Sequence, residues 1–128
     1  MNGKLLDTNV VVRILNGDEQ LINELSKFDD LCTCTIVLGE LLYGAAKSFY
    51  SENNRKKAID FCSRFRLLDV TDYVAEVYGT LKNELLSKGN VLPENDIWIA
   101  AVALANNMAL VTQDKHFERV SNLLLIKL

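Results

Sequence analysis

Along the chain, short apolar runs alternate with longer stretches in which apolar residues recur every three or four positions. Runs of the first kind predict buried strands, and stretches of the second kind predict helices with one apolar face. Regular alternation of the two is typical of βα units, which place parallel strands in one sheet and cover that sheet with helices. We therefore predict an α/β fold built on a mainly parallel sheet of roughly five strands.

The boundaries of these elements follow from the same pattern. The predicted strands span residues 4–7, 31–35, 67–70, 109–112 and 123–126. The predicted helices span residues 10–15, 19–28, 37–49, 55–65, 73–87 and 96–106. The helix at 73–87 has the clearest ends, because Asp72 is a natural N-cap and Gly89 lies just beyond the last turn. Pro93 precedes the helix at 96–106 and places Asp96 in its first turn.

Size and composition favour one soluble domain. With 128 residues, of which 49% are hydrophobic, the chain can bury one sizeable core and is too short for two ordinary domains, so we expect residues 1–128 to form one domain. The longest apolar run, residues 97–105, is too short to span a bilayer, and the first residues lack the apolar stretch of a signal peptide. Three cysteines without zinc-site spacing fit structural thiols in a reducing compartment, so we expect a cytoplasmic protein with no membrane association.

The charge of the chain argues against nucleic-acid binding by bulk electrostatics. The formal net charge is −3, whereas that mode of binding needs a broad positive surface. Residues 47–66 depart from this average, because they hold six basic side chains against two acidic ones. A solvated helix face explains such a run, and an RNA-facing edge that includes Arg55, Lys56 and Arg64 is the alternative.

Two aspartates lie at the ends of predicted strands. Asp7 ends the first strand, and Asp114 closely follows the strand at 109–112. In an open parallel sheet the carboxyl ends of the strands form the ligand-binding edge, so both side chains belong at one rim. Asp7 has a simpler explanation as the cap of the helix that follows, a role that its neighbours Thr8 and Asn9 could also fill.

Two further acids lie on predicted helices. Glu40 is flanked by apolar residues on nearly every side, where an ionised carboxylate is costly without a cation or hydrogen-bond donors. Two interpretations of Glu40 are possible, namely a salt bridge with a buried lysine or arginine, or a functional role. Gly44, one turn later, leaves this face of the helix open to a close approach. For Asp96, a favourable interaction with the helix dipole of about 0.3–1 kcal/mol is a sufficient explanation on its own.

These separate explanations do not account for convergence of the four acids. Two carboxylates about 4 Å apart repel each other by roughly 4 kcal/mol at an effective dielectric constant of about 20, so a cluster persists only when cations or protons neutralise it. Oxygen ligands favour Mg²⁺ or Mn²⁺ over zinc, and such a site can activate water for attack on a phosphodiester. The chain has one histidine, His116, and neither a glycine-rich phosphate loop nor a G-x-S-x-G motif. We therefore predict metal chemistry at these acids, namely Asp7, Glu40, Asp96 and Asp114.

Four short segments form a pattern that covers nearly the whole chain. They are Leu-Leu-Asp-Thr-Asn at residues 5–9, Leu-Gly-Glu-Leu-Leu-Tyr-Gly at 38–44, Asn-Asp-Ile-Trp-Ile-Ala-Ala at 95–101 and Leu-Val-Thr-Gln-Asp-Lys-His-Phe at 110–117. In this order and at this spacing they resemble the PIN-domain nucleases, and among them the VapC-type toxins of toxin–antitoxin pairs. The resemblance implies a PIN-like three-layer α/β/α fold that cleaves RNA with Mg²⁺ or Mn²⁺ bound by Asp7, Glu40, Asp96 and Asp114.

The same resemblance implies further roles and partners. The acid of the last segment varies in the family, and this chain has His116 where some members have a further acid. Thr112 matches a hydroxyl residue that orients a carboxylate or binds phosphate, and Asn9 matches a polar residue beside the first acid. The implied partners are the RNA substrate, a small antitoxin whose C-terminal segment blocks the acidic pocket, and a second copy of the chain in a homodimer. A sticky surface could come from aromatic residues that are more often core, namely Tyr43, Phe49 and Tyr50.

Two alternatives stay open at this point. Residues 5–9 also resemble the opening of a haloacid-dehalogenase motif, in which an aspartate nucleophile accepts a phosphoryl group, but that motif needs an acid where Asn9 stands. The second alternative is an interaction module that keeps the fold and has lost the chemistry, although all four acids are present. The sequence as a whole favours a metal-dependent endoribonuclease.

Overall fold

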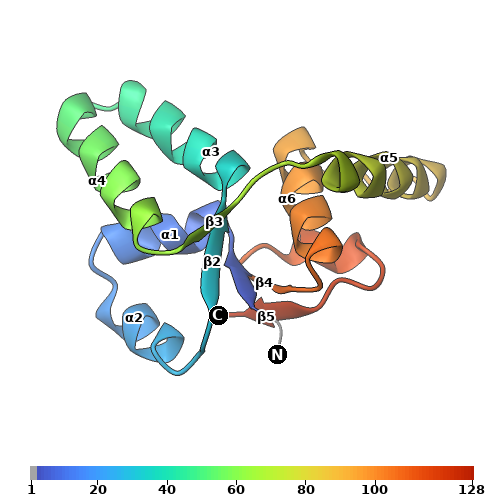
Figure 1. Cartoon of the computed structure of the whole chain (residues 1–128), viewed down its shortest axis with the longest axis horizontal. Helices are drawn as coiled ribbons and strands as arrows, with labels where there is room; N and C mark the ends of the chain where they lie inside the picture. Colours follow the sequence, from blue (N-terminus) through green and yellow to red (C-terminus); the bar gives the residue numbers. More distant parts are fainter. Residues whose placement is uncertain (1–2) are drawn as a thin grey trace.

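One sheet of five parallel strands lies at the centre of the computed structural model, which describes residues 3–128 (Figure 1). The strands are β1 (Lys4–Leu6), β2 (Leu31–Cys34), β3 (Arg66–Leu68), β4 (Ala109–Thr112) and β5 (Leu125–Lys127), and they lie side by side in the order β3-β2-β1-β4-β5. Every neighbouring pair is parallel, so the predicted mainly parallel, five-stranded sheet is confirmed. The carboxyl ends of the strands therefore meet at one edge of the sheet.

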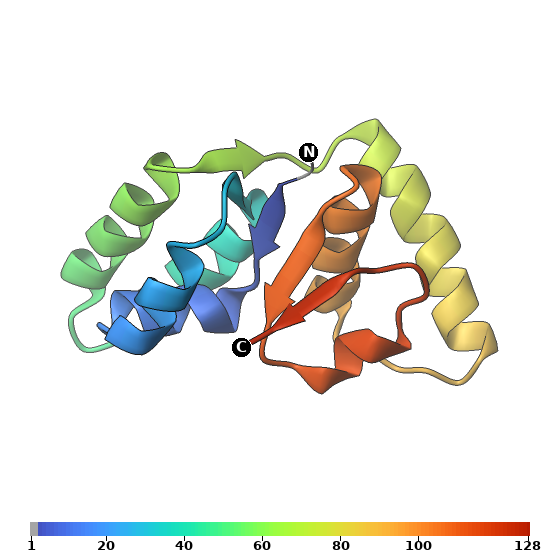
Figure 2. The same ribbon diagram turned by 90° about the horizontal axis from the view of Figure 1, so that it is seen from below.

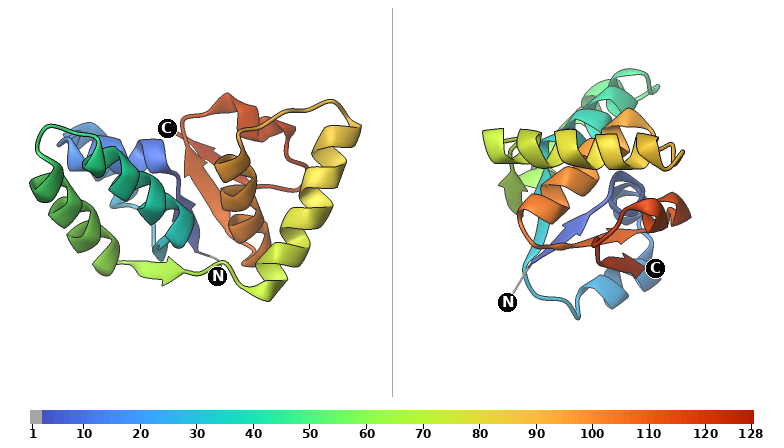
Figure 3. Two further views of the ribbon diagram at one scale, coloured as in Figure 1. Left: turned by 90° about the horizontal axis from the view of Figure 1, so that it is seen from above. Right: turned by 90° about the vertical axis from the view of Figure 1, so that its right-hand side faces the viewer.

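Within residues 3–128, six α-helices and one short 3₁₀ segment connect the strands. They are α1 (Thr8–Leu15), α2 (Glu19–Leu25), α3 (Thr35–Ala46), α4 (Ser51–Ser63), α5 (Asp72–Ser87), α6 (Glu94–Ala105) and η1 (Lys115–Arg119). Figure 2 shows α1 to α4 on one side of β1 and α5 and α6 on the other. α3 packs against α4, and α5 packs against α6. These two pairs of helices extend away from the strands on either side of the molecule (Figure 3).

Both faces of the central strand β1 are covered. Leu5 and Leu6 point to opposite sides of the strand, and both are fully buried. Residues 99–103 of α6 are also fully buried, and three of these five side chains are alanines, which let the helix pack closely. Burial on both sides explains why β1 carries two consecutive apolar residues, Leu5 and Leu6, and it agrees with the three-layer α/β/α arrangement. The core thereby fixes the position of Asp7, the residue that follows β1.

Five of the six helices begin one to four residues earlier than the apolar pattern predicts. In α1 and α5 the reason is a capping side chain that lies outside the apolar stripe. Asp7 caps α1, which therefore begins at Thr8 and not at residue 10. Thr71 caps α5 by accepting a hydrogen bond of 3.2 Å from the Val74 N–H. Asp72 is consequently the first residue of this helix, and its prediction as the N-cap is wrong.

The expectation that Tyr43, Phe49 and Tyr50 belong to the core is also wrong. Their exposed fractions are 67%, 83% and 70%. α3 ends at Ala46, three residues before Phe49. The connection from α3 to α4 lies far from the strands, so aromatic side chains near it have no sheet to pack against (Figure 3).

Two other expectations concern the membrane and the cysteines. No helix within residues 3–128 is both long and apolar enough to cross a membrane. All three cysteines are buried and free, in agreement with structural thiols.

Phe117 offers a test of the packing that holds the last site-bearing segment, because its side chain lies in η1 and is fully buried. We expect Phe117→Ala to lower the free energy of unfolding by about 3–5 kcal/mol, since it removes a large apolar side chain and leaves a cavity. The matched control is Phe49→Ala, which should change stability by less than about 0.5 kcal/mol because Phe49 is exposed. Urea unfolding followed by circular dichroism measures both, and equal losses would contradict the described packing.

Candidate metal centre

Asp7 lies where β1 ends and α1 begins. Its carboxylate Oδ1 accepts a hydrogen bond of 2.8 Å from the Thr8 N–H, which makes it the N-cap of α1. The side chain is only 3% exposed, although an ionised carboxylate is costly to bury. The capping explanation therefore holds for one carboxylate oxygen and leaves the burial of the other unexplained.

Thr112, the last residue of β4, connects two of the predicted acids. Its hydroxyl donates a hydrogen bond of 2.7 Å to Asp7 Oδ2 and accepts one of 3.0 Å from the Asp114 N–H. One hydroxyl therefore orients the first carboxylate and fixes the backbone of the residue that carries another. This is the orienting contact that the resemblance implied for Thr112.

The side chains of Asp114 and Asp96 meet at His116. The His116 Nε2 atom lies 2.8 Å from Asp96 Oδ2 and 3.8 Å from Asp114 Oδ2. Asp114 Oδ2 also accepts a hydrogen bond of 3.3 Å from the Asn9 side-chain amide. Asp96 is the third residue of α6, which begins at Glu94. The prediction that Asp96 lies in a first helical turn is confirmed, and its contact with His116 adds a second role to the dipole interaction.

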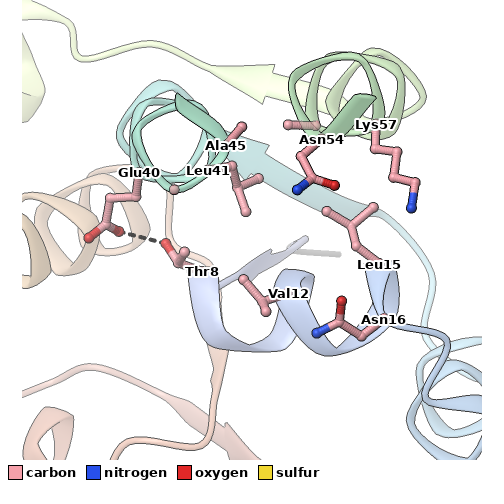
Figure 4. A pocket seen from close by; sticks show the side chains of 11 residues that line it. Thr8, Val12, Leu15, Asn16, Glu40, Leu41, Ala45, Asn54 and Lys57 are labelled. Atoms are coloured by element: carbon pink, nitrogen blue, oxygen red, sulfur yellow. Dashed lines mark hydrogen bonds between the residues drawn. The ribbon is translucent and has the colours of Figure 1, made fainter. Parts of the chain in front are cut away.

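Glu40 reaches the same region from α3. Its Oε1 atom accepts a hydrogen bond of 2.6 Å from the Thr8 hydroxyl (Figure 4), and Oε2 accepts one of 3.5 Å from the Asn95 side-chain amide. No lysine or arginine among residues 3–128 forms an ion pair with this carboxylate. The interpretation of Glu40 as half of a buried salt bridge is therefore wrong.

The four acids influence one another electrostatically. Burial raises the pKa of Asp7 from its usual 3.8 to about 6, and the nearby charges of Asp96 and Asp114 add to the rise, while the hydrogen bonds from Thr112 and Thr8 oppose it. Burial also raises the pKa of Asp96; His116 opposes this rise, and Glu40 and Asp114 add to it. We call Asp7, Glu40, Asp96 and Asp114 the carboxylate cluster. Within it, Asp96 and Asp114 destabilise the charged form of Asp7, and Glu40 and Asp114 destabilise that of Asp96.

The donor atoms of this region fit a divalent cation. Ligand atoms of Asp96, Asp114 and His116 all lie within 4.8 Å of one another. Asn9 Oδ1 is buried and has no hydrogen-bond partner among residues 3–128, which is unusual for a buried polar atom and leaves it free to face a cation. Carboxylate and amide oxygens are ligands that Mg²⁺ and Mn²⁺ accept, and an imidazole nitrogen suits Mn²⁺ better than Mg²⁺.

The sequence does not predict that His116 contacts Asp96 and lies close to Asp114. From the sequence, this histidine stands out only as the position where related proteins can carry an acid. The spacing of His116 from Asp114 could have indicated this contact. A residue two positions after Asp114 stays at the same edge of the sheet if the chain turns there, and η1 provides that turn.

The structure does not bring Arg55 and Lys56 to the carboxylate cluster. Both are exposed on α4 and line a surface hollow with Glu52 and Asp60. The basic residue of α4 that shares a hollow with Glu40 is instead Lys57, which lies at the far end of a groove of about 260 Å³ between α1, α3 and α4 (Figure 4). Thr8 and Glu40 line the same groove, as does Asn54 (Figure 4). In the sequence, Asn54 and Lys57 each precede a buried residue of α4, Ala58 and Phe61, by four positions. This spacing places them on the same face of the helix and could have indicated that face.

The raised pKa of Asp7 predicts how stability depends on pH when metal is removed. The folded protein holds the Asp7 proton more tightly than the unfolded chain, so stability falls as pH rises from about 4 to about 6 and is lowest above that range. Asp7→Asn keeps the cap and removes this cost, so in EDTA at pH 7.5 it should stabilise the protein by about 1–3 kcal/mol.

The test is urea unfolding of both proteins at pH 7.5 and pH 4.5, where the gain should fall to about a third at the lower pH. Asp69→Asn serves as the control, because Asp69 is exposed and lies outside the cluster. Added Mn²⁺ should stabilise the parent protein more than Asp7→Asn, since the substitution removes one carboxylate of the cluster. Lower stability of Asp7→Asn at pH 7.5 would contradict the electrostatic description.

Comparisons with known proteins agree with this geometry. The family model described as the PIN domain matches residues 4–123. The chain is 37% identical to ribonuclease VapC2 of Rickettsia felis, with 94% of each chain covered, and 38% identical to ribonuclease VapC2 of Haemophilus influenzae, with 91% of this chain and 90% of that protein covered.

Solved structures give the same answer for the fold. The VapBC2 complex of Rickettsia felis bound to a fragment of its promoter DNA contains a chain that matches with a TM-score of 0.90 and 36% identity, covering 98% of both chains. The DNA-bound VapBC complex of Salmonella typhimurium matches with a TM-score of 0.92 and 30% identity, covering 99% of this chain and 98% of that one. With a family model matched over nearly its whole length and relatives above 30% identity, the chain belongs to the PIN-domain family and to its VapC-like members.

Proposed function

We propose that this protein is a metal-dependent endoribonuclease whose active site is the carboxylate cluster. The observation that carries the proposal is the convergence of four acids without a lysine or arginine partner among residues 3–128. Such a site is neutralised by cations, and its relatives are named ribonucleases.

Mg²⁺ or Mn²⁺ is the proposed cofactor, held by Asp7, Glu40, Asp96 and Asp114. The bound metal would supply an activated water and stabilise the leaving oxygen of the phosphodiester. The other groups of the chain orient these ligands: Thr112 holds Asp7, and Thr8 and Asn95 hold Glu40. Neutral donors can do this without cancelling the negative charge that attracts the metal.

The aspartate-nucleophile alternative is disfavoured by the surroundings of Asp7. A nucleophilic carboxylate must be reachable, whereas this side chain is nearly completely buried and both of its oxygens accept hydrogen bonds. Asn9, which stands where that motif needs an acid, donates to Asp114 instead. The idle-module alternative is disfavoured because all four acids converge.

Cleavage assays test the proposed chemistry. Purified protein should cleave cellular RNA with Mn²⁺ or Mg²⁺ and lose this activity in EDTA. Asp7→Asn and Glu40→Gln should each lower the rate by more than about 100-fold, and Thr112→Val by about 10- to 100-fold, because Thr112 acts through Asp7. Asp69→Asn is the exposed control and should cleave normally. Metal-independent cleavage, or full activity of Asp7→Asn, would rule out this site. In a parallel calorimetry experiment, the parent protein should bind Mn²⁺, and Asp7→Asn should bind it more weakly.

We further propose that the protein acts in the cytoplasm as the toxin of a toxin–antitoxin pair. Related chains have been solved in VapBC complexes, and one of those studies reports a toxin–antitoxin system. The proposed partner is a small antitoxin that occupies the acidic pocket, and a homodimer is the proposed oligomeric state.

Expression in bacteria tests the toxin role. The parent protein should arrest growth and Asp7→Asn should not, since the latter lacks a metal ligand. Co-expression of the small protein encoded beside this one should restore growth. Arrest by both proteins to the same extent would show that toxicity does not come from RNA cleavage. Light scattering of the purified protein measures its oligomeric state.

A further inference from the structure

An open trough leads away from the carboxylate cluster along the outer face of α3. It has a volume of about 630 Å³ and reaches from Asn95 past Glu40 to the C-terminal end of the helix. The side chains that define its far part are Tyr43 and Lys47, and two glycines, Gly39 and Gly44, also line it. We call this feature the α3 trough. None of the roles described so far uses Tyr43 or Lys47.

Tyr43 presents an accessible aromatic ring one helical turn from Glu40. The residue is 67% exposed, and residues three apart on a helix are neighbours on its surface, with Cβ atoms about 5–6 Å apart. A Cβ atom added at Gly39 or Gly44 would meet no other atom within 4 Å, so open space surrounds these positions on the helix surface. A planar group can therefore approach the ring of Tyr43.

Lys47 supplies a positive charge beside this ring. Its Nζ atom lies 4.8 Å from the centroid of the Tyr43 ring, which is a cation–π contact. Lys47 is exposed and forms no ion pair with any of residues 3–128. Its charge is therefore available to an anionic ligand that lies against the ring.

We propose that Tyr43 and Lys47 bind the single-stranded RNA next to the cleaved bond, with Tyr43 stacking on one base and Lys47 contacting a neighbouring phosphate. This inference rests on the proposed ribonuclease function and adds the part of the surface that holds the substrate. An aromatic ring beside a cation is the usual combination for unpaired nucleic acid, because every base has a face that can stack. Paired RNA does not offer such a face.

The net charge of the protein favours binding through such a stacking platform. With a formal net charge of −3 and four acids at the centre of the site, the protein cannot hold RNA by a broad positive surface. Stacking does not depend on net charge, so it can supply affinity where bulk electrostatics cannot. Lys57 provides a further positive charge at the far end of the groove that Thr8 and Glu40 also line.

The test measures binding of a labelled single-stranded RNA of mixed sequence, about 12 nucleotides long, by fluorescence anisotropy. Asp7→Asn serves as the parent protein, so that the RNA stays intact in Mg²⁺. Adding Tyr43→Ala should weaken binding roughly 5- to 100-fold, and Tyr43→Trp should restore it because stacking tolerates any large aromatic ring. Adding Lys47→Ala should lower the slope of log affinity against log salt by about 0.7.

Matched controls lie on another face of the molecule. Tyr73→Ala and Lys88→Ala replace exposed residues of α5 and its C-cap and should leave affinity unchanged. Gly39→Gln is a second variant, because it adds a side chain to open space next to Tyr43 on a helix and should cover the ring without destabilising the fold. It should weaken RNA binding while the melting temperature stays the same or rises.

The outcomes separate this proposal from the proposed function. Unchanged RNA affinity of Tyr43→Ala, or an equal loss in Tyr73→Ala, overturns the platform even when the parent chain without Asp7→Asn cleaves RNA normally. If Tyr43→Ala leaves RNA affinity unchanged and weakens binding of a protein partner, the α3 trough belongs to that partner, and the proposal of an RNA platform is overturned. Absence of metal-dependent cleavage by the unmodified chain refutes the ribonuclease itself.

Discussion

Mutual repulsion of carboxylates at the carboxyl edge of the sheet is the constraint around which this molecule is arranged. The charges of Asp96 and Asp114 raise the pKa of Asp7, and those of Glu40 and Asp114 raise the pKa of Asp96. Nothing in such a cluster favours its own formation, so the fold must impose it. β1 and α6 do this, because Leu5 and Leu6 of β1 and residues 99–103 of α6 are fully buried, so neither element can shift to relieve the repulsion.

Neutral donors hold the carboxylates in place. Hydroxyls of Thr8 and Thr112 and amides of Asn9 and Asn95 supply the contacts, and His116 adds an imidazole nitrogen. A lysine or arginine in these positions would lower the energy of the empty site and would also compete with a metal ion. The protein thus keeps its negative charge unsatisfied, at a cost in stability that a bound cation can recover.

The sequence predicts the strands and the acids that follow them, because both depend on local pattern and on the rule that parallel strand ends share an edge. It indicates a functional role for Glu40, because an acidic residue is unusual in an apolar helix. It does not predict that Lys57 lines a groove with Glu40, or that His116 contacts Asp96. Both depend on how α4 and η1 are oriented relative to the sheet. The exposure of Tyr43 is equally non-local: its neighbours in sequence are apolar, and only the departure of α3 from the sheet exposes the ring.

The hydrogen bond between Thr112 and Asp7 joins residues that are 105 positions apart in the chain. β1 cannot acquire its β4 neighbour, and Asp7 cannot meet Asp96 or Asp114, until nearly the whole protein has been synthesised. Contacts of such long range form late, because loop closure must precede them. A ribosome translating this protein therefore carries an incomplete carboxylate cluster for most of the time of synthesis, so the proposed nuclease would stay inactive while it is close to the RNA of its own ribosome.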